Sequence, residues 1–251
     1  MEKIYENVIK LIDESKRILV FTGAGISTNS GIPDFRSKNG LYNHIDRDSD
    51  LPYPEAVFEI DYFKQNPYPF YKLTRSMLLQ EFLPTKCHRF IAYLESKNKV
   101  ELVVTQNIDM LHHKAGSEKV LECHGTFRTA KCIECHKTYT LDTIQQTILD
   151  GEIPTCDCGG VIKPDIVFFR EKVPENFSKI LDKQPDADMI LILGTSLLVQ
   201  PSAGFAVEIA GKVPSVLVNK DITDYDSRMT YVLHDDLDVF AEKVWGKLVK
   251  E

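Results

Sequence analysis

Residues 18–25 read Ile18-Leu19-Val20-Phe21-Thr22-Gly23-Ala24-Gly25, an uninterrupted apolar run that ends in a glycine turn. Runs of the same kind recur at 100–105, 189–194 and 215–219, and each stops at small or polar residues. A strand that is apolar along its whole length is buried on both faces, which is typical of a parallel sheet between two layers of helices. We therefore predict an α/β fold with helices on both faces of a parallel sheet, whose ligands bind where the strands end.

Helical patterns separate these runs. Apolar residues recur at helical spacing over 4–12, and similar patterns cover 86–97 and 201–211. Pro201 suits the first position of the last of these helices, and Gly211 suits its end.

Two segments interrupt the α/β pattern. Residues 37–79 combine many prolines and aromatic side chains, which predicts a helical insertion or lid. Residues 126–163 are polar and cysteine-bearing, and they hold too few apolar residues for a core of their own without a metal.

The second insertion carries two close cysteine pairs, Cys132 with Cys135 and Cys156 with Cys158. Four thiolates complete a tetrahedral zinc site with no open position, so we expect one structural Zn²⁺. The second pair is spaced one residue tighter than usual, and the two glycines that follow it can supply the turn. Two alternatives stay open: a redox pair, and a metal site in which His136 replaces a cysteine.

The composition excludes several classes of protein. The 251 residues carry a net charge of −7, which argues against a nucleic-acid backbone as the main partner. No apolar run approaches a membrane span, and the first residues lack the apolar core of a signal peptide, so we expect a cytoplasmic protein with no membrane partner. Cys87 and Cys123 lie outside the cysteine cluster, and we expect them to be small buried side chains.

The glycine turn is the first segment of the candidate binding site. In Thr22-Gly23-Ala24-Gly25-Ile26-Ser27-Thr28, glycines would let backbone amides approach a pyrophosphate at the start of a helix. A plain strand-to-helix turn is the alternative, because Thr28 stands at the third glycine position of the dinucleotide fingerprint. In the following Gly31-Ile32-Pro33-Asp34-Phe35-Arg36, Arg36 can pair with phosphate and Phe35 can exclude water, although for this segment taken alone a surface loop with a solvated Arg36 and a core Phe35 is the better explanation.

The second candidate group follows the run at 100–105. Gln106, Asn107 and Asp109 stand at this strand end, where they can bind an amide or a ribose, or where Asn107 or Asp109 can cap a helix. Further along, His124 lies between the sheet and the cysteine segment and is a candidate general base. His112, His113 and His136 compete for that role.

Taken together and in order, six features resemble the sirtuin family of NAD-dependent protein deacylases, as in a short bacterial-type member. They are Gly23-Ala24-Gly25-Ile26-Ser27, Gly31-Ile32-Pro33-Asp34-Phe35-Arg36, Thr105-Gln106-Asn107-Ile108-Asp109, His124-Gly125, the four cysteines and Gly194-Thr195-Ser196. The resemblance implies a Rossmann-like NAD-binding domain and a small domain made of a zinc module and a helical module. The corresponding ranges are 1–36, 80–125 and 164–251 for the first, 37–79 for the helical module and 126–163 for the zinc module.

The resemblance also implies roles for single residues. His124 is the general base, with Asn107 as a second catalytic residue. The residues that the resemblance places in contact with NAD are Gly23, Ala24, Gly25, Thr28, Asp34, Phe35, Arg36, Gln106, Asn107, Ile108, Asp109, His124, Gly194, Thr195, Ser196, Asn219, Lys220 and Asp238. Val167, Phe168 and Leu198 flank an acyl-lysine peptide that pairs as an added strand, which tolerates varied peptide sequences.

The implied reaction converts acetyl-lysine and NAD to lysine, nicotinamide and O-acetyl-ADP-ribose, with acetylated proteins as partners of a monomeric chain. Protein ADP-ribosyltransferase and a non-catalytic NAD- or zinc-binding module are the alternatives. Two departures from the family stand out: Arg170 replaces a common glycine, and Thr74 stands where desuccinylating members carry arginine, with Arg75 one residue further. On a helix that extra residue turns the guanidinium by about 100°, so we expect uncharged acyl groups.

Overall fold

The computed structural model describes residues 2–35, 37, 40–44 and 51–249. The chain divides into two compact units. The first, here called the sheet unit, contains Met1–Asp34, Leu83–Cys123 and Glu175–Glu251. The second, the insertion unit, contains Phe35–Phe82 and His124–Pro174.

The sheet unit is built on a parallel sheet of six strands in the order β3-β2-β1-β7-β8-β9. The strands are β1 (Ile18–Thr22), β2 (Val100–Thr105), β3 (Val120–Glu122), β7 (Met189–Leu193), β8 (Ser215–Val218) and β9 (Tyr231–Leu233). The four strands predicted from apolar runs are confirmed, and they are the four inner ones. The two edge strands were missed because each has three residues and is partly exposed, which leaves no apolar run to detect.

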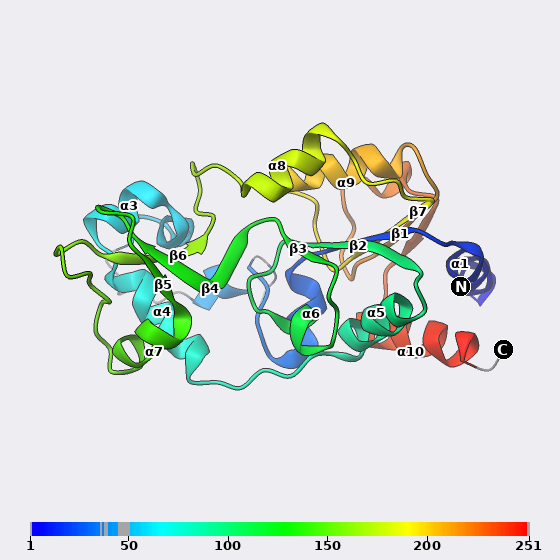
Figure 1. Cartoon of the computed structure of the whole chain (residues 1–251). Coiled ribbons are helices and arrows are strands. Elements are labelled where there is room, and N and C mark those ends of the chain that lie inside the picture. The colour runs from blue at the N-terminus through cyan, green and yellow to red at the C-terminus, as the bar shows by residue number, and fades with distance from the viewer. Residues whose placement is uncertain (1, 36, 38–39, 45–50, 250–251) are drawn as a thin grey trace. The chain divides into compact units, whose positions relative to one another are not determined.

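Helices cover both faces of this sheet, as predicted (Figure 1). The helices of the unit are α1 (Glu2–Glu14), α5 (Lys86–Ser96), α6 (Leu111–Lys114), α8 (Glu175–Asp182), α9 (Ser202–Ala210) and α10 (Leu237–Leu248), with 3₁₀ turns η1 (Ala24–Ser30) and η3 (Asp226–Arg228). Helix α9 begins one residue later than expected, so Pro201 occupies its N-cap and not its first turn, while Gly211 stands at the C-cap as predicted.

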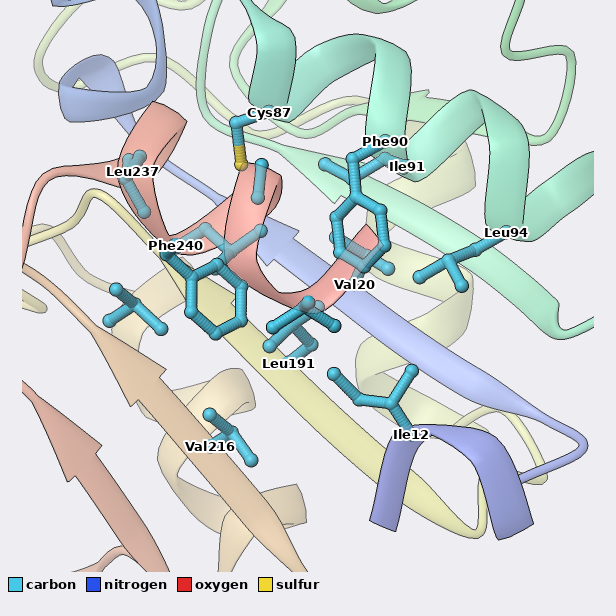
Figure 2. Close-up of a cluster of buried hydrophobic side chains, with 14 of the residues drawn as sticks. Ile12, Val20, Cys87, Phe90, Ile91, Leu94, Leu191, Val216, Leu237 and Phe240 are labelled. Carbon is cyan, nitrogen blue, oxygen red and sulfur yellow. The ribbon is translucent and has the colours of Figure 1, made fainter. Parts of the chain in front are cut away.

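One face of the sheet packs on α1, α5 and α10. Figure 2 shows Val20, Leu191 and Val216 of three neighbouring strands facing Phe90 of α5 and Phe240 of α10. The alternate strand residues are also fully buried, and α8 and α9 meet through rings 5.7 Å apart, Phe177 against Phe205. Burial on both faces explains why the inner strands are apolar throughout and not alternating.

The insertion unit joins two segments that are far apart in the sequence. Its antiparallel sheet has the order β5-β4-β6, with β4 (Gly125–Cys132), β5 (Thr138–Thr140) and β6 (Ile162–Ile166). Helix α7 (Leu141–Leu149) lies between β5 and β6 in the chain. The proline-rich segment forms α2 (Leu41–His44), η2 (Pro54–Phe58), α3 (Ile60–Gln65) and α4 (Tyr68–Leu78), which agrees with the helical insertion predicted there.

An aromatic core holds these segments together. The Phe168 ring lies 5.3 Å from that of Phe63 and 5.1 Å from that of Phe70, and the Tyr71 hydroxyl donates to the carbonyl of Ile162. Residues 164–174 therefore group with the insertion unit, whereas the sequence-based boundary placed them with the parallel sheet. The cysteine segment also shares this core, which its own composition did not reveal.

Candidate active site

The glycine turn packs against the end of the neighbouring strand β7. The amides of Gly23 and Gly25 donate to the carbonyl oxygens of Leu193 and Gly194, at 3.0 and 2.9 Å. A Cβ atom on Gly25 would lie 2.8 Å from the Cα atom of Gly194, and one on Gly23 would lie 2.7 Å from Cβ of Thr195. In the structure these two amides bind the protein itself, and close packing between the two loops requires glycine at both positions.

Polar side chains from two strand ends meet beside this turn. The Asn107 amide donates to the carbonyl of Gly23 (3.2 Å) and to the hydroxyl of Ser27 (3.1 Å). The Ser27 hydroxyl in turn donates to the Asp109 carboxylate at 2.6 Å. Both N–H groups of Asn107 are therefore engaged, which fixes the orientation of the side chain. Burial raises the pKa of Asp109, and the hydrogen bond from Ser27 opposes that shift.

Neither Asn107 nor Asp109 is a helix N-cap, because Met110 occupies that position of α6. Asp109 accepts a hydrogen bond from the Leu111 amide at the start of α6, whereas Asn107 makes no such bond. Gln106 lies next to the cluster and donates to Thr195 at 3.0 Å, which links the ends of β2 and β7. Ser27 was not singled out by sequence reasoning, although a serine within the glycine turn that follows an apolar strand is the signal that could have found it.

Two buried histidines lie beneath this cluster. Nε2 of His112 is 2.9 Å from the Thr22 hydroxyl, which donates to Thr105 at 2.8 Å. The ring of His88 lies 4.7 Å from that of His112. Burial lowers the pKa of His88 to about 3 and lowers that of His112 well below its ordinary value, so both rings are neutral.

This pair predicts acid sensitivity. The unfolded chain protonates these histidines near pH 6.5, whereas the folded protein does not, so stability is lost as the pH falls from about 6.5 towards 3. His88 contributes a slope of about 1.4 kcal/mol per pH unit in that window, and His112 acts in the same direction. Urea unfolding at several pH values should show this slope, and His88→Asn should flatten it. The same replacement at His234, a more exposed histidine, should not flatten it.

The residues assigned to the adenosine end occupy the sheet unit. Gly194, Thr195 and Ser196 follow β7, with Thr195 buried and Ser196 exposed. Asn219 and Lys220 follow β8, where Lys220 pairs with Asp236 at 3.0 Å. The Asp238 carboxylate accepts a hydrogen bond from the Cys87 amide at the start of α5, so it has a structural contact of its own. Cys87 and Cys123 are both buried, as predicted.

The remaining residues of the first loop divide between the units. Ala24 and Thr28 lie in η1, where the Thr28 hydroxyl donates a hydrogen bond to the Gly25 carbonyl. Ile108, which follows β2 and not the first loop, is half-buried and precedes α6. Asp34 ends the sheet unit, and Phe35 begins the insertion unit, 5.5 Å from the ring of Tyr42 and 5.8 Å from that of Phe58. Arg36 lies outside the described residues.

His124 opens the insertion unit. Its carbonyl accepts a hydrogen bond from the Val167 amide at 2.8 Å, which places the predicted base beside the predicted substrate strand. Gly125 has a φ of +80°, and a Cβ atom there would lie 2.1 Å from the carbonyl oxygen of Asp165. Only glycine permits this close approach of β4 to β6. Among the competing histidines, His112 is buried beneath the sheet end and His136 is exposed.

The four cysteine sulfurs converge on one point, as predicted. All lie within 4.8 Å of one another, and the pairs Cys132–Cys158 and Cys135–Cys156 are 3.5 Å apart. A tetrahedral ion with bonds of about 2.3 Å requires sulfurs roughly 3.8 Å apart, so the set fits zinc. The backbone amide of Cys135 donates to the Cys132 sulfur and lowers the pKa of that thiol, which favours the thiolate that a metal needs.

Gly159 and Gly160 form the turn that the short Cys156-Asp157-Cys158 spacing requires. Gly159 has a φ of +87°, and the Cys156 amide donates to the carbonyl of Gly160 at 2.8 Å, which closes the hairpin. A Cβ atom on Gly160 would lie 2.6 Å from the Cys132 sulfur. The turn thus brings both sulfurs to the same point, as the sequence predicted.

The segment after β6 carries the predicted substrate-binding residues of this unit. Phe168 is buried in the aromatic core, and the amide of Phe169 donates to the Phe58 carbonyl at 2.8 Å. Arg170 has a φ of +73°, in a region where glycine is the common residue, and its guanidinium bonds to Asp61 at 2.9 Å. Leu198, the third predicted residue, belongs to the sheet unit and is exposed.

Residues 23–201 match the Sir2 family. The chain belongs to the Sir2 family. The NAD-dependent deacetylase sir2D of Dictyostelium discoideum is 39% identical over 97% of this chain and 46% of its own length. The NAD-dependent protein deacetylase HST2 of Candida albicans is 41% identical over 97% of this chain and 76% of its own length. This Sir2-family chain therefore spans less than half of the Dictyostelium relative.

Solved structures give the same result. The structure of a Sir2 enzyme superposes with a TM-score of 0.91 at 34% identity, covering 100% of this chain and 99% of that one. A Sir2 structure with p53 peptide and NAD⁺ has a TM-score of 0.84 at 34% identity, covering 98% and 99%. The predicted resemblance and the predicted Rossmann-like fold are confirmed. Among the described residues no helix is long and apolar enough to cross a membrane.

Proposed function

We propose that this chain is an NAD-dependent protein-lysine deacetylase that forms lysine, nicotinamide and O-acetyl-ADP-ribose. The observation that carries the proposal is the buried chain of hydrogen bonds from Asn107 through Ser27 to Asp109 at the carboxyl ends of the sheet, where α/β folds of this type bind nucleotides. The names of the relatives agree with it, and one Sir2 structure contains deacetylated p53 peptide with 3′-O-acetyl-ADP-ribose.

In the proposed reaction the acyl oxygen of the modified lysine attacks C1′ of the nicotinamide ribose, and nicotinamide leaves. His124 then takes a proton from a ribose hydroxyl, which attacks the acyl carbon, and one water is consumed before the products separate. The fixed amide of Asn107 and the Asp109 carboxylate supply oriented polar groups for the ribose and the nicotinamide amide. No hydride is transferred, because NAD is a substrate that is cleaved.

The four cysteines are proposed to hold one structural zinc ion. Their geometry fits a closed tetrahedral site, so the ion has no open position for a substrate or a reacting water. Its proposed contribution is to join the end of β4 to the Thr155–Val161 hairpin and so to stabilise the insertion unit that carries His124. Metal analysis of the purified protein should find one zinc per chain.

The activity is tested by incubating the purified chain with NAD and an acetyl-lysine peptide, followed by mass spectrometry. The expected product is O-acetyl-ADP-ribose, and His124→Ala should not form it. ADP-ribose attached to protein, or nicotinamide release that needs no acetyl-peptide, would identify an ADP-ribosyltransferase instead. A chain that binds NAD but forms neither product would be a non-catalytic module.

We expect acetyl-lysine to be preferred over succinyl-lysine. Thr74 is buried, and the Arg75 side chain donates to the carbonyl of Leu149 at the end of α7, so that guanidinium already has a partner within the insertion unit. An unpaired carboxylate in an acyl pocket costs several kcal/mol. The ratio of kcat/KM values for matched peptides should favour acetyl by at least about a hundredfold. A propionyl peptide is the control, since a Sir2 structure with a propionylated peptide is known. Efficient desuccinylation with weak deacetylation would contradict this.

A further inference from the structure

A buried lysine lies beneath the segment that carries Val167 and Phe168. Lys163 belongs to β6, and only 9% of its side chain is exposed. Its ammonium group donates to the carbonyl oxygens of Pro164 (3.3 Å) and Ile166 (2.8 Å) and pairs with the Glu171 carboxylate (2.8 Å). All three of its N–H donors thus have acceptors. The same ammonium lies 4.2 Å from the centre of the Phe168 ring.

The partner carboxylate completes the arrangement. The Glu171 carboxylate accepts a hydrogen bond from the Phe168 amide at 2.8 Å, and the Glu171 amide donates to the Phe168 carbonyl at 3.0 Å. The ion pair therefore binds the two main-chain groups that flank Val167, the carbonyl of Ile166 and the amide of Phe168. The amide of Val167 itself bonds to the carbonyl of His124. The Lys163 and Glu171 side chains thus supply to this segment the hydrogen bonds that a neighbouring strand supplies to a residue within a sheet.

Stability alone does not explain this pair. Removing a lysine from water is costly, and burial lowers the pKa of Lys163 while the Glu171 carboxylate opposes that shift. An apolar side chain of similar size would fill the space beside Phe168 at no such cost. What an apolar residue cannot supply is directional hydrogen bonding to two specified backbone atoms, and these atoms adjoin the residue bonded to His124.

We propose that the Lys163–Glu171 ion pair is a positioning pair for the acyl-lysine substrate. It fixes the backbone at Val167 and Phe168, and through the Val167 amide it fixes the distance between the substrate segment and the backbone of His124. This inference rests on the proposed deacetylase function. It predicts that loss of the pair impairs peptide binding and leaves NAD binding intact, because the pair and the backbone groups it binds belong to the insertion unit, whereas the residues assigned to the adenosine end of NAD belong to the sheet unit.

The test compares Lys163→Met, Lys163→Arg and Glu171→Gln with wild type. Lys163→Met should raise KM for an acetyl-lysine peptide about tenfold, with KM for NAD within about twofold of wild type. Lys163→Arg keeps the charge and should recover most of the loss. Lys131→Met is the control, since it removes a half-exposed lysine from the adjacent strand β4, and it should leave both KM values unchanged. Thermal unfolding and zinc content verify that each variant folds.

Two results would overturn the proposal: a folded Lys163→Met variant with unchanged peptide KM, or a parallel rise of both KM values. If Lys163→Met does not fold, the nearly isosteric Glu171→Gln decides by the same criteria. Amide hydrogen exchange gives a second readout that needs no activity, and the Phe168 amide should exchange faster in both variants. If wild type forms no O-acetyl-ADP-ribose, the proposed function fails. Independently of that result, a Phe168 amide that exchanges as slowly in the variants as in wild type would refute the positioning role.

Discussion

Replacing Cys132 with serine is expected to unfold the insertion unit and to abolish the proposed deacetylase activity. Cys132 is one of the two buried members of the cluster and lies at the end of β4. Its sulfur is 3.5 Å from the Cys158 sulfur and accepts hydrogen bonds from the amides of Glu134 and Cys135. Structural zinc sites bind with apparent free energies of about 10–16 kcal/mol, which equals or exceeds the whole stability of a typical domain. The shared aromatic core does not replace that contribution.

Metal analysis, circular dichroism and limited proteolysis measure the outcome. Cys132→Ser should lose its zinc, expose sites within 124–174 to protease and form no O-acetyl-ADP-ribose, and chelation of wild type should do the same. Cys87→Ala is the matched control, because Cys87 is equally buried but lies in the sheet unit, far in the sequence from the cluster. That variant should lose some stability and keep its zinc. Full activity in a zinc-free protein would refute the structural role of the metal.

The fold was predictable where burial leaves a pattern in the sequence. The four inner strands are buried on both faces and so appear as apolar runs, whereas β3 and β9 are short edge strands with partly exposed residues. The insertion unit was predictable only in part. Its two segments share a core through Phe63, Phe70 and Phe168, and contacts between distant aromatic residues leave no periodicity that a single sequence reveals.

The candidate site follows the same division. Asn107 and Asp109 were identified because parallel strands end at a common edge, which brings their side chains to the glycine turn. The four cysteines were identified by spacing alone. Ser27 and His88 were not, and His112 was considered only as a competing base, because a buried hydrogen-bonded network depends on which side chains face each other, and the sequence records only their order.

Replacing Gly25 with alanine is expected to destabilise the sheet unit and to weaken NAD binding. The new Cβ atom would lie 2.8, 2.9 and 3.1 Å from the Cα, carbonyl oxygen and carbonyl carbon of Gly194, all of which are backbone atoms that cannot turn aside. Gly194 has a φ of +63°, and a Cβ atom on it would lie 2.5 Å from the Ile26 amide nitrogen, so the two loops are in close contact from both sides. We expect a loss of about 3 kcal/mol in unfolding free energy, the cost of overpacking a close contact.

The effect on NAD follows from the position of the contact. Displacing the glycine turn from β7 also moves Gly23, whose carbonyl accepts the Asn107 amide, and Ser27, which links Asn107 to Asp109. Calorimetric titration should therefore show at least about tenfold weaker NAD binding, which corresponds to about 1.4 kcal/mol. Gly246→Ala is the matched control, because the site is an open, exposed position in α10 where alanine should stabilise the helix by about 0.5–1 kcal/mol. A Gly25→Ala variant with the stability and the NAD affinity of wild type would contradict this prediction. It would show that the glycine turn can move away from the loop at Gly194 without affecting the NAD site.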